Sequence, residues 1–293
     1  MSEPDGIGQA PAQFLPNVIE LFIRHAKCIL EHKPATTHLW MIFPLHQPFS
    51  LALFSLLFCC GTGYAKPVEV HARLAPQARA ENKVALTLDA CSGRFDEDLL
   101  AFLIRKRIPA TIFVTKKWLD KNPRGVAVIK SNLDLFDVED HGEKHIPAII
   151  GSGRTVYGLA GEPDVAHLQR EVTEGAKAIT STIGIAPQWY RGAGAKYDAE
   201  AMTEIKRLGY KIAGFSLNAD HGATLHKQAI ADKFKRLQPG DVIIAHMNKP
   251  QSESAQGLSS GLNKALKQGF VFVRLDQVEM QKMPDPKTRR DKS

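Results

Sequence analysis

Two histidines four residues apart carry the first chemical signal in this sequence. His141 and His145 belong to the segment His-Gly-Glu-Lys-His, and on a helix this spacing would place both imidazoles on one face. Two imidazoles and a carboxylate form a common open site for zinc or a similar divalent cation, with one position left for water. Such a cation lowers the pKa of its bound water to about 7 and polarises a carbonyl oxygen. The pair therefore predicts a metal centre.

Polar residues also stand at four places where apolar runs stop. They are Asp89, His141, Arg191 and His246. Because ligands bind at the carboxyl ends of parallel strands, we expect these four side chains to converge on one rim of the fold. Convergence would place the histidine pair beside a carboxylate, a guanidinium and a further imidazole.

Short β-branched or apolar runs alternate with helical stretches from Val84 onward. We expect strands at 84–89, 110–115, 135–139, 188–191, 211–215, 242–246 and 270–273, and helices at 96–107, 124–131, 165–182, 199–208, 227–237 and 254–267. This alternation implies a parallel sheet with crossover helices. About seven such units in roughly 200 residues fit one α/β domain, a distorted or incomplete (β/α) barrel of about seven parallel strands. An open doubly wound sheet is the alternative.

Four segments follow one another in an order that resembles a known family. They are Thr87-Leu-Asp-Ala-Cys-Ser-Gly93, His141-Gly-Glu-Lys-His145, Tyr190-Arg-Gly-Ala-Gly194 and Val242-Ile-Ile-Ala-His246. They are similar to the motifs of the polysaccharide deacetylase (NodB-homology) family, also called carbohydrate esterase family four. The separations agree as well: 52 residues from Asp89 to His141, 46 from His145 to Arg191, and 55 from Arg191 to His246.

The resemblance covers about residues 82–280. It implies a distorted (β/α) barrel and a metal-dependent hydrolase that acts on linear amide bonds and removes acetyl groups from N-acetylated glycans. Position by position, Asp89 matches the family's catalytic base, and Arg191 matches the residue that orients it. His141 and His145 match two metal ligands, and His246 matches the general acid.

The first motif departs from the family at Ala90, which stands where a second acid is normally the third metal ligand. Three arrangements would restore the site. Asp89 ligates directly beside the histidine pair and passes the role of base to a group such as Asp220, Cys91 ligates as a thiolate and favours zinc, or water fills the place. We favour Asp89, because Cys91 lies in the turn beyond the strand and is more simply a small buried hydrophobe.

The family's fourth motif is blurred into Leu217-Asn-Ala-Asp-His-Gly222. There the resemblance implies that Asp220 or His221 stands for an acidic residue that pairs with Arg191. We include Asp220 among the expected catalytic residues.

The substrate pocket differs from the family pattern too. Ala193-Gly194 replaces the Pro-Tyr that usually follows the motif arginine, which removes one wall of the sugar pocket. We expect the backbone amides of Ala193 and Gly194 to meet the developing oxyanion. Residues 146–161, with Arg154 and Tyr157, are expected to form a long loop over the rim that acts as a substrate lid.

The beginning of the chain predicts export. The apolar stretch Phe49–Cys60 is followed by Gly63 and Ala65, which suit a cleaved secretory signal. Because signals begin a chain, we suspect that Met41 is the true start and that residues 1–40 are misassigned; an uncleaved membrane-surface anchor is the alternative. The expected division is a signal-containing segment at 1–65, a linker at 66–83, the deacetylase-like domain at 84–283 and a basic tail at 284–293.

Composition limits which other classes of protein the chain can belong to. The 293 residues carry a net charge of +7 and are 44% hydrophobic, which excludes wholesale disorder. The sequence does not combine basic and aromatic residues in a pattern typical of nucleic-acid binding. Cleavage after Ala65 would leave Cys91 as the only cysteine of the four, which excludes a disulfide framework. The expected location is periplasmic or secreted, with membrane or envelope association only through the N-terminal segment or the tail.

The sequence thus predicts an exported deacetylase of N-acetylated glycans that uses a divalent metal, zinc before others. Two alternatives stay open. A catalytically silent carbohydrate-binding protein on the same fold would explain Ala90, and an amidohydrolase of a non-sugar acetamide would explain the widened pocket at Ala193-Gly194. We prefer the enzyme, because a decayed site would not be expected to keep its other polar residues together.

Overall fold

The computed structural model describes residues 66–283. The expected signal, the alternative start and the basic tail lie outside the described residues. Among the helices that the structure describes, none has the length and the apolar character needed to cross a membrane.

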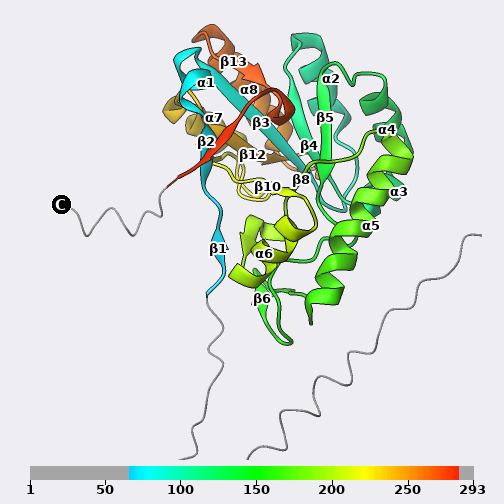
Figure 1. Cartoon of the computed structure of the whole chain (residues 1–293). Coiled ribbons are helices and arrows are strands. Elements are labelled where there is room, and N and C mark those ends of the chain that lie inside the picture. Colours follow the sequence, from blue (N-terminus) through cyan, green and yellow to red (C-terminus); the bar gives the residue numbers. More distant parts are fainter. Residues whose placement is uncertain (1–65, 284–293) are drawn as a thin grey trace, which may run out of the picture. The chain divides into compact units, whose positions relative to one another are not determined.

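One parallel sheet organises the described part of the chain (Figure 1). Its strands are β3 (Lys83–Ala90), β4 (Ala110–Val114), β5 (Phe136–Asp140), β8 (Trp189–Tyr190), β10 (Lys211–Ile212), β11 (Leu217–Asn218), β12 (Val242–His246) and β13 (Val271–Val273). Seven of them lie in the order β10-β8-β5-β4-β3-β12-β11, and β13 pairs with the start of β3. This order follows the chain around a circle that is open only between β10 and β11, so the expected incomplete barrel is confirmed over the doubly wound alternative.

Helices surround the strands of this sheet (Figure 1). They are α2 (Glu97–Lys106), α3 (Lys116–Lys121), α4 (Pro123–Lys130), α5 (Val165–Ile183), α6 (Ala199–Arg207), α7 (Lys227–Lys233) and α8 (Ser254–Lys267). Asp96, Asp164 and Asp198 each accept a backbone N–H at the start of a helix, as N-cap residues do. The sequence did not predict α3, since a six-residue helix is too short to show a period.

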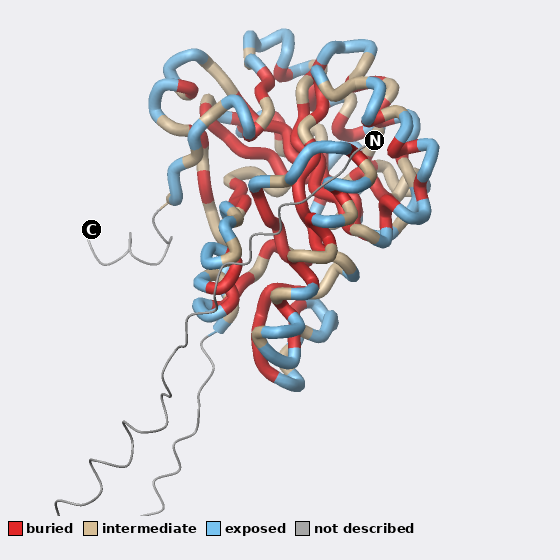
Figure 2. Tube along the Cα trace, turned by 45° about the vertical axis from the view of Figure 1, so that its right-hand side comes forward, coloured by how far each residue is buried: buried red, intermediate tan, exposed pale blue. Residues whose placement is uncertain are grey.

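The two faces of β3 have different surroundings. Leu86, Leu88 and Ala90 are fully buried in one large apolar cluster with residues of α2 and α8. The alternate residues Thr87 and Asp89 bind the Arg191 side chain on the other face. This alternation follows from the two-residue period of a strand, and Figure 2 shows the buried residues concentrated along the central strands.

Residues 68–80 form part of the barrel, so the expected linker at 66–83 is wrong. β1 (Val68–Glu69) pairs with β9 (Lys196–Tyr197), β2 (Ala72–Leu74) pairs with β14 (Met280–Lys282), and α1 (Pro76–Ala80) follows. Backbone hydrogen bonds join Ala72 N to Phe215 O at 3.1 Å and Phe215 N to Val70 O at 3.2 Å. This arm, residues 68–74, therefore fills the opening between β10 and β11. Its stabilising partners are remote in sequence, although apolar residues at alternate positions from Val68 to Leu74 were a usable signal.

Candidate active site

A cavity of about 610 Å³ lies at the carboxyl ends of the parallel strands. Asp89, Cys91, His141, His145 and His246 line it together. The polar residues that end separate strands thus come together as the sequence analysis expected. Arg191 is fully buried and does not itself line the cavity.

Asp89 is held by an ion pair. Arg191 Nη1 donates a hydrogen bond to Asp89 Oδ1 at 2.7 Å and another to Thr87 Oγ1 at 2.9 Å. The Arg191 guanidinium also lies 4.1 Å from the centre of the Phe113 ring. Burial alone would raise the pKa of Asp89, but the charges of Arg191, His141 and His246 outweigh it and lower that pKa. The carboxylate is therefore ionised and fixed in direction.

His141 presents one ring nitrogen to the cavity. Its Nδ1 donates a hydrogen bond to the Arg191 backbone carbonyl, which leaves Nε2 as the ring nitrogen that faces the cavity. That Nε2 lies 3.6 Å from Cys91 Sγ and 3.8 Å from Asp89 Oδ2. His141 is therefore oriented as a ligand would be.

The segment from His141 to His145 is not helical, so the helical arrangement considered for this pair does not occur. Gly142 and His145 both have positive φ, of 89° and 68°. The chain turns because Glu171 of α5 accepts hydrogen bonds from Lys144 N and Ile146 N at Oε1, at 2.9 Å and 3.0 Å. The two imidazole centres nevertheless lie 4.8 Å apart, so the turn brings the rings together by another route.

Cys91 belongs to this cluster and not to the apolar core. The donor atoms of Cys91, His141 and His145 all lie within 4.8 Å of one another, and residues 66–283 hold no other group of this kind. Asp89 is not part of the group, although one of its oxygens approaches His141. Burial would raise the pKa of the Cys91 thiol, but hydrogen bonds with His141, His145 and His246 lower it well below its usual value.

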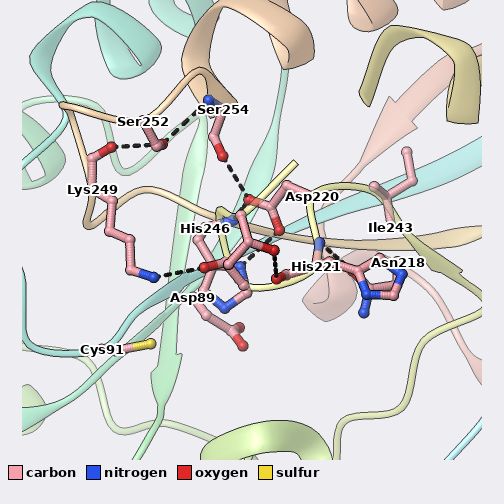
Figure 3. A network of polar contacts seen from close by, with 12 residues as sticks. Asp89, Cys91, Asn218, Asp220, His221, Ile243, His246, Lys249, Ser252 and Ser254 are labelled. Atoms are coloured by element: carbon pink, nitrogen blue, oxygen red, sulfur yellow. Dashed lines mark hydrogen bonds and ion pairs between the residues drawn. The ribbon is translucent and has the colours of Figure 1, made fainter. Parts of the chain in front are cut away.

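His246 at the end of β12 is paired with Asp220. His246 Nδ1 lies 2.9 Å from Asp220 Oδ1, and Asp220 Oδ2 accepts bonds from His246 N and from Ser254 Oγ (Figure 3). Burial lowers the pKa of His246, but Asp220 and Cys91 raise it well above its usual value. The expected pairing of Asp220 with Arg191 is therefore wrong, because Arg191 binds Asp89 and Asp220 binds His246.

The expected lid contains a β-hairpin, and of its two expected substrate-binding residues only Tyr157 lines the cavity. The hairpin consists of β6 (Thr155–Val156) and β7 (Leu159–Ala160), and Tyr157 at its turn is 69% exposed and lines the cavity with Gly194. The Tyr157 hydroxyl donates to Glu69 Oε1 at 3.1 Å, and Lys196 Nζ lies 4.5 Å from the centre of its ring.

Arg154 is not a lining residue of the cavity. Its guanidinium donates to the Ile150 carbonyl at 2.6 Å and forms an ion pair with the buried Asp198. Arg154 therefore links the base of the hairpin to Asp198, and it does not face the cavity as a substrate-binding residue would.

Sequence reasoning missed three residues that support the site. Glu171 holds the turn before His145, Ser254 binds Asp220, and Glu69 of the arm lines the cavity and binds Tyr157. Glu171 had a usable signal, because it stands between Leu168 and Val172 on the buried face of α5. Ser254 and Glu69 had none, since their partners are distant in sequence.

Comparisons with known proteins agree with this fold. A family model described as polysaccharide deacetylase matches residues 77–213. Solved structures similar to the chain include a carbohydrate esterase family four pseudoenzyme from Bacillus anthracis, with 16% identity, a TM-score of 0.57, and coverage of 73% of this chain and 69% of that one. A mutant of that pseudoenzyme with restored enzymatic activity matches with the same TM-score.

Two further similar structures are described as an esterase and a deacetylase. PdaA of Bacillus subtilis, a family 4 carbohydrate esterase, is 19% identical with a TM-score of 0.57, and the match covers 72% of this chain and 84% of that one. The Bc1960 peptidoglycan N-acetylglucosamine deacetylase is 16% identical with a TM-score of 0.58, over 71% and 90% of the two chains. No curated protein sequence matches the chain. The motifs, the barrel and the family match agree that the chain is similar to the polysaccharide deacetylase family.

Proposed function

We propose that this protein is a metal-dependent hydrolase that removes acetyl groups from N-acetylated glycans. One observation carries the proposal. A pair of imidazoles, His141 and His145, faces a cavity that also holds the carboxylate of Asp89, bound by Arg191, and the imidazole of His246, bound by Asp220. Amide hydrolysis needs a base and an acid on either side of an activated water.

We propose that His141 and His145 hold a divalent cation, with zinc favoured because imidazole nitrogen suits it. The Nδ1 hydrogen bond of His141 to the Arg191 carbonyl supports this, since metal-bound histidines are oriented in the same way. When bound, the cation would lower the pKa of a water molecule and polarise the acetamide carbonyl.

Asp89 is proposed as the general base. Its lowered pKa keeps it ionised at neutral pH, and the hydrogen bond from Arg191 to Oδ1 leaves Oδ2 on the side of His141. In this role Asp89 accepts the proton of the attacking water while the new carbon–oxygen bond forms. Arg191 keeps the carboxylate in place.

His246 is proposed as the general acid. Its raised pKa favours the protonated imidazole, and Asp220 holds Nδ1, so Nε2 is the atom that delivers the proton. His246 protonates the amine nitrogen as the amide carbon–nitrogen bond breaks, which gives acetate and the free amino sugar. Proton transfer of this kind contributes about 10²–10⁴-fold to the rate.

Gly194 and Tyr157 are proposed to position the substrate. Gly194 faces the cavity with φ of 69°, so its backbone approaches the substrate without a side chain between them. The exposed ring of Tyr157 offers a flat apolar surface to a sugar ring at the rim.

Acetate release from N-acetylglucosamine oligomers tests the proposal. The zinc-loaded protein should release acetate, and His246→Ala should lower kcat by about 10²–10⁴-fold. His167→Ala, which changes an exposed histidine of α5, is the matched control and should keep full activity. Absence of acetate from the loaded wild type, with oligomers still bound, would instead support the silent carbohydrate-binding protein that Ala90 suggests.

We propose further that the protein is exported, because the apolar segment Phe49–Cys60 and the small residues Gly63 and Ala65 have the form of a secretory signal. An N-acetylated glycan of the envelope is then the expected partner. N-terminal sequencing of the mature protein tests this: a first residue of Lys66 supports export, and an intact N-terminal segment contradicts it.

A further inference from the structure

We infer that Cys91 is the third protein ligand of the metal, so that one thiolate and two imidazoles hold the cation in place of the carboxylate and two imidazoles that the family pattern implies. This inference rests on the proposed metal-dependent function. It concerns a residue to which the family pattern gives no role.

The first step is the direction of the Ala90 side chain. Leu86, Leu88 and Ala90 occupy one face of β3 and belong to the apolar cluster under α2 and α8, with Ala90 fully buried. An acid at position 90 would enter that cluster as long as β3 keeps its alternation. Ala90 therefore fits its surroundings, and the place of the third ligand passes to a neighbouring residue.

The second step is the end of β3. The strand stops at Ala90, whose carbonyl accepts from Thr115 N at 3.2 Å, and the Thr115 hydroxyl donates to the Cys91 carbonyl. These two bonds fix the chain just beyond the strand. The Cys91 side chain lies in the cavity that Asp89 and the histidines line (Figure 3).

The third step is the spacing of the donor atoms. Cys91 Sγ lies 3.6 Å from His141 Nε2, and both atoms are within 4.8 Å of the donor nitrogen of His145. A tetrahedral zinc ion with Zn–S near 2.3 Å and Zn–N near 2.0–2.1 Å separates its sulfur and nitrogen ligands by about 3.6 Å. The Cys91–His141 pair already has that separation, and three protein ligands leave a fourth position for water.

The fourth step is that Asp89 already has a partner, the Arg191 side chain. Arg191 binds its Oδ1, and the carboxylate is outside the group of mutually close donor atoms. Asp89 can then remain the base, and the site needs no substitute such as Asp220. Cys91 thus supplies the missing ligand without removing the catalytic carboxylate.

Binding of the cation by Cys91 requires no oxidant or reductant. The Cys91 thiolate forms the sulfur–metal bond, any proton on the sulfur passes to solvent, and nothing is oxidised or reduced. Because a thiolate is a soft ligand, the site should prefer zinc or cobalt to magnesium or calcium.

Cobalt(II) spectroscopy tests the inference on the full chain. A background with Cys28, Cys59 and Cys60 changed to serine leaves Cys91 as the only thiol of the four. In this background one equivalent of cobalt should bind and give a near-ultraviolet thiolate-to-cobalt charge-transfer band. Cys91→Ser should abolish the band and weaken zinc binding by more than about 100-fold, since even outer partners of a ligand are worth 10–100-fold.

Two variants separate ligation from packing. Cys91→Asp should restore much of the zinc affinity without the band, because it returns a carboxylate to the ligand position. Ala90→Asp added to Cys91→Ser should not restore it, because that side chain faces the core. A cobalt-loaded background protein without the band, or zinc affinity unchanged by Cys91→Ser, would overturn the inference.

A further measurement avoids the risk that a Cys91 variant does not fold. In the same background, zinc should slow alkylation of Cys91 by iodoacetamide by about tenfold or more, and equal rates with and without zinc would overturn the inference. Acetate release distinguishes the two proposals: acetate without the charge-transfer band contradicts only thiolate ligation, whereas the band without acetate contradicts only the deacetylase function.

Discussion

The backbone carbonyl of Arg191 binds Nδ1 of His141 while the side chain of the same arginine binds Asp89. One residue thereby fixes both the proposed base and a proposed metal ligand, through separate groups. The two functions can therefore be separated by mutation, because a substitution at position 191 removes the guanidinium and keeps the carbonyl.

Arg191→Met should reduce activity much more than zinc affinity. The variant leaves the buried Asp89 charge without its partner, and removal of one member of a buried pair costs about 3–5 kcal/mol of stability. The pKa of Asp89 should rise, so the acidic limb of kcat/KM should move to higher pH. Zinc titration, thermal unfolding and a pH profile check this. A loss of zinc affinity as large as the loss of activity would contradict it.

Asp220→Asn should move the alkaline limb of the pH profile to lower pH. His246 must be protonated to act as an acid, and Asp220 raises the pKa of His246 by its charge and its hydrogen bond. Without that carboxylate the imidazole loses its proton at lower pH, and a shift of about 1–3 units is expected. Ser254→Ala removes only a hydrogen bond to Asp220 at 3.1 Å and is the matched control with a smaller shift. An unmoved limb in Asp220→Asn would exclude His246 as the acid.

Glu171→Ala should weaken zinc binding by about 10–100-fold, because Glu171 holds the turn that presents His145. Glu171→Gln should have a smaller effect, since an amide oxygen can still accept the hydrogen bonds that Oε1 receives from Lys144 N and Ile146 N. Zinc titration of both variants, normalised to the folded fraction, checks the difference. Equal losses in the two variants would show that charge and not hydrogen bonding holds the turn.

Glu139→Gln should make the stability of the protein less dependent on pH. Glu139 accepts N–H groups of Gln188 and Trp189 at 2.7 Å, and burial followed by the charge of Asp137 raises its pKa from 4.5 to about 8. The folded state thus holds a proton that the unfolded state has lost between pH 4.5 and about 8, so stability falls as pH rises through this window. Denaturant unfolding at pH 5 and pH 8.5 measures the fall, and the variant should show less of it. A fall of equal size in the variant would assign it to other groups.

Tyr157→Ala should raise KM for N-acetylglucosamine oligomers by about 2- to 10-fold with little change in kcat, because an aromatic contact is worth roughly 0.5–1.5 kcal/mol. Tyr157→Phe removes only the hydroxyl bond to Glu69 and should keep most of the affinity. Steady-state kinetics on oligomers of increasing length check both variants. An unchanged KM in Tyr157→Ala would remove this residue from the substrate site.

The parts of the fold that follow from local patterns were predictable from sequence. Val242–His246 and Ser254–Lys267 agree with the expected ranges, because a buried apolar run and an amphipathic period specify them locally. The arm at 68–74 escaped notice since its partners, Phe215 and Met280–Lys282, lie far away in the chain.

The candidate site was predictable in its membership and less so in its geometry. The sequence placed Asp89, His141 and His246 on one rim because strand ends converge there. It misjudged His145, because a non-glycine residue with φ of 68° depends on a distant acid, Glu171. It also undervalued Cys91, because the first residue after a strand no longer follows the two-residue period.

The arm, residues 68–74, also has a consequence for the proposed removal of a signal segment. Glu69 binds the tyrosine at the mouth of the cavity, and Val68 begins the strand that pairs with Lys196–Tyr197. An N-terminus at Lys66 would leave both contacts intact, whereas one after Leu74 would remove Glu69 from the cavity wall and the backbone hydrogen bonds of the arm to Phe215. If the proposed signal is removed, the contacts of Val68 and Glu69 therefore set the last position at which the chain can be cut without loss of this part of the structure.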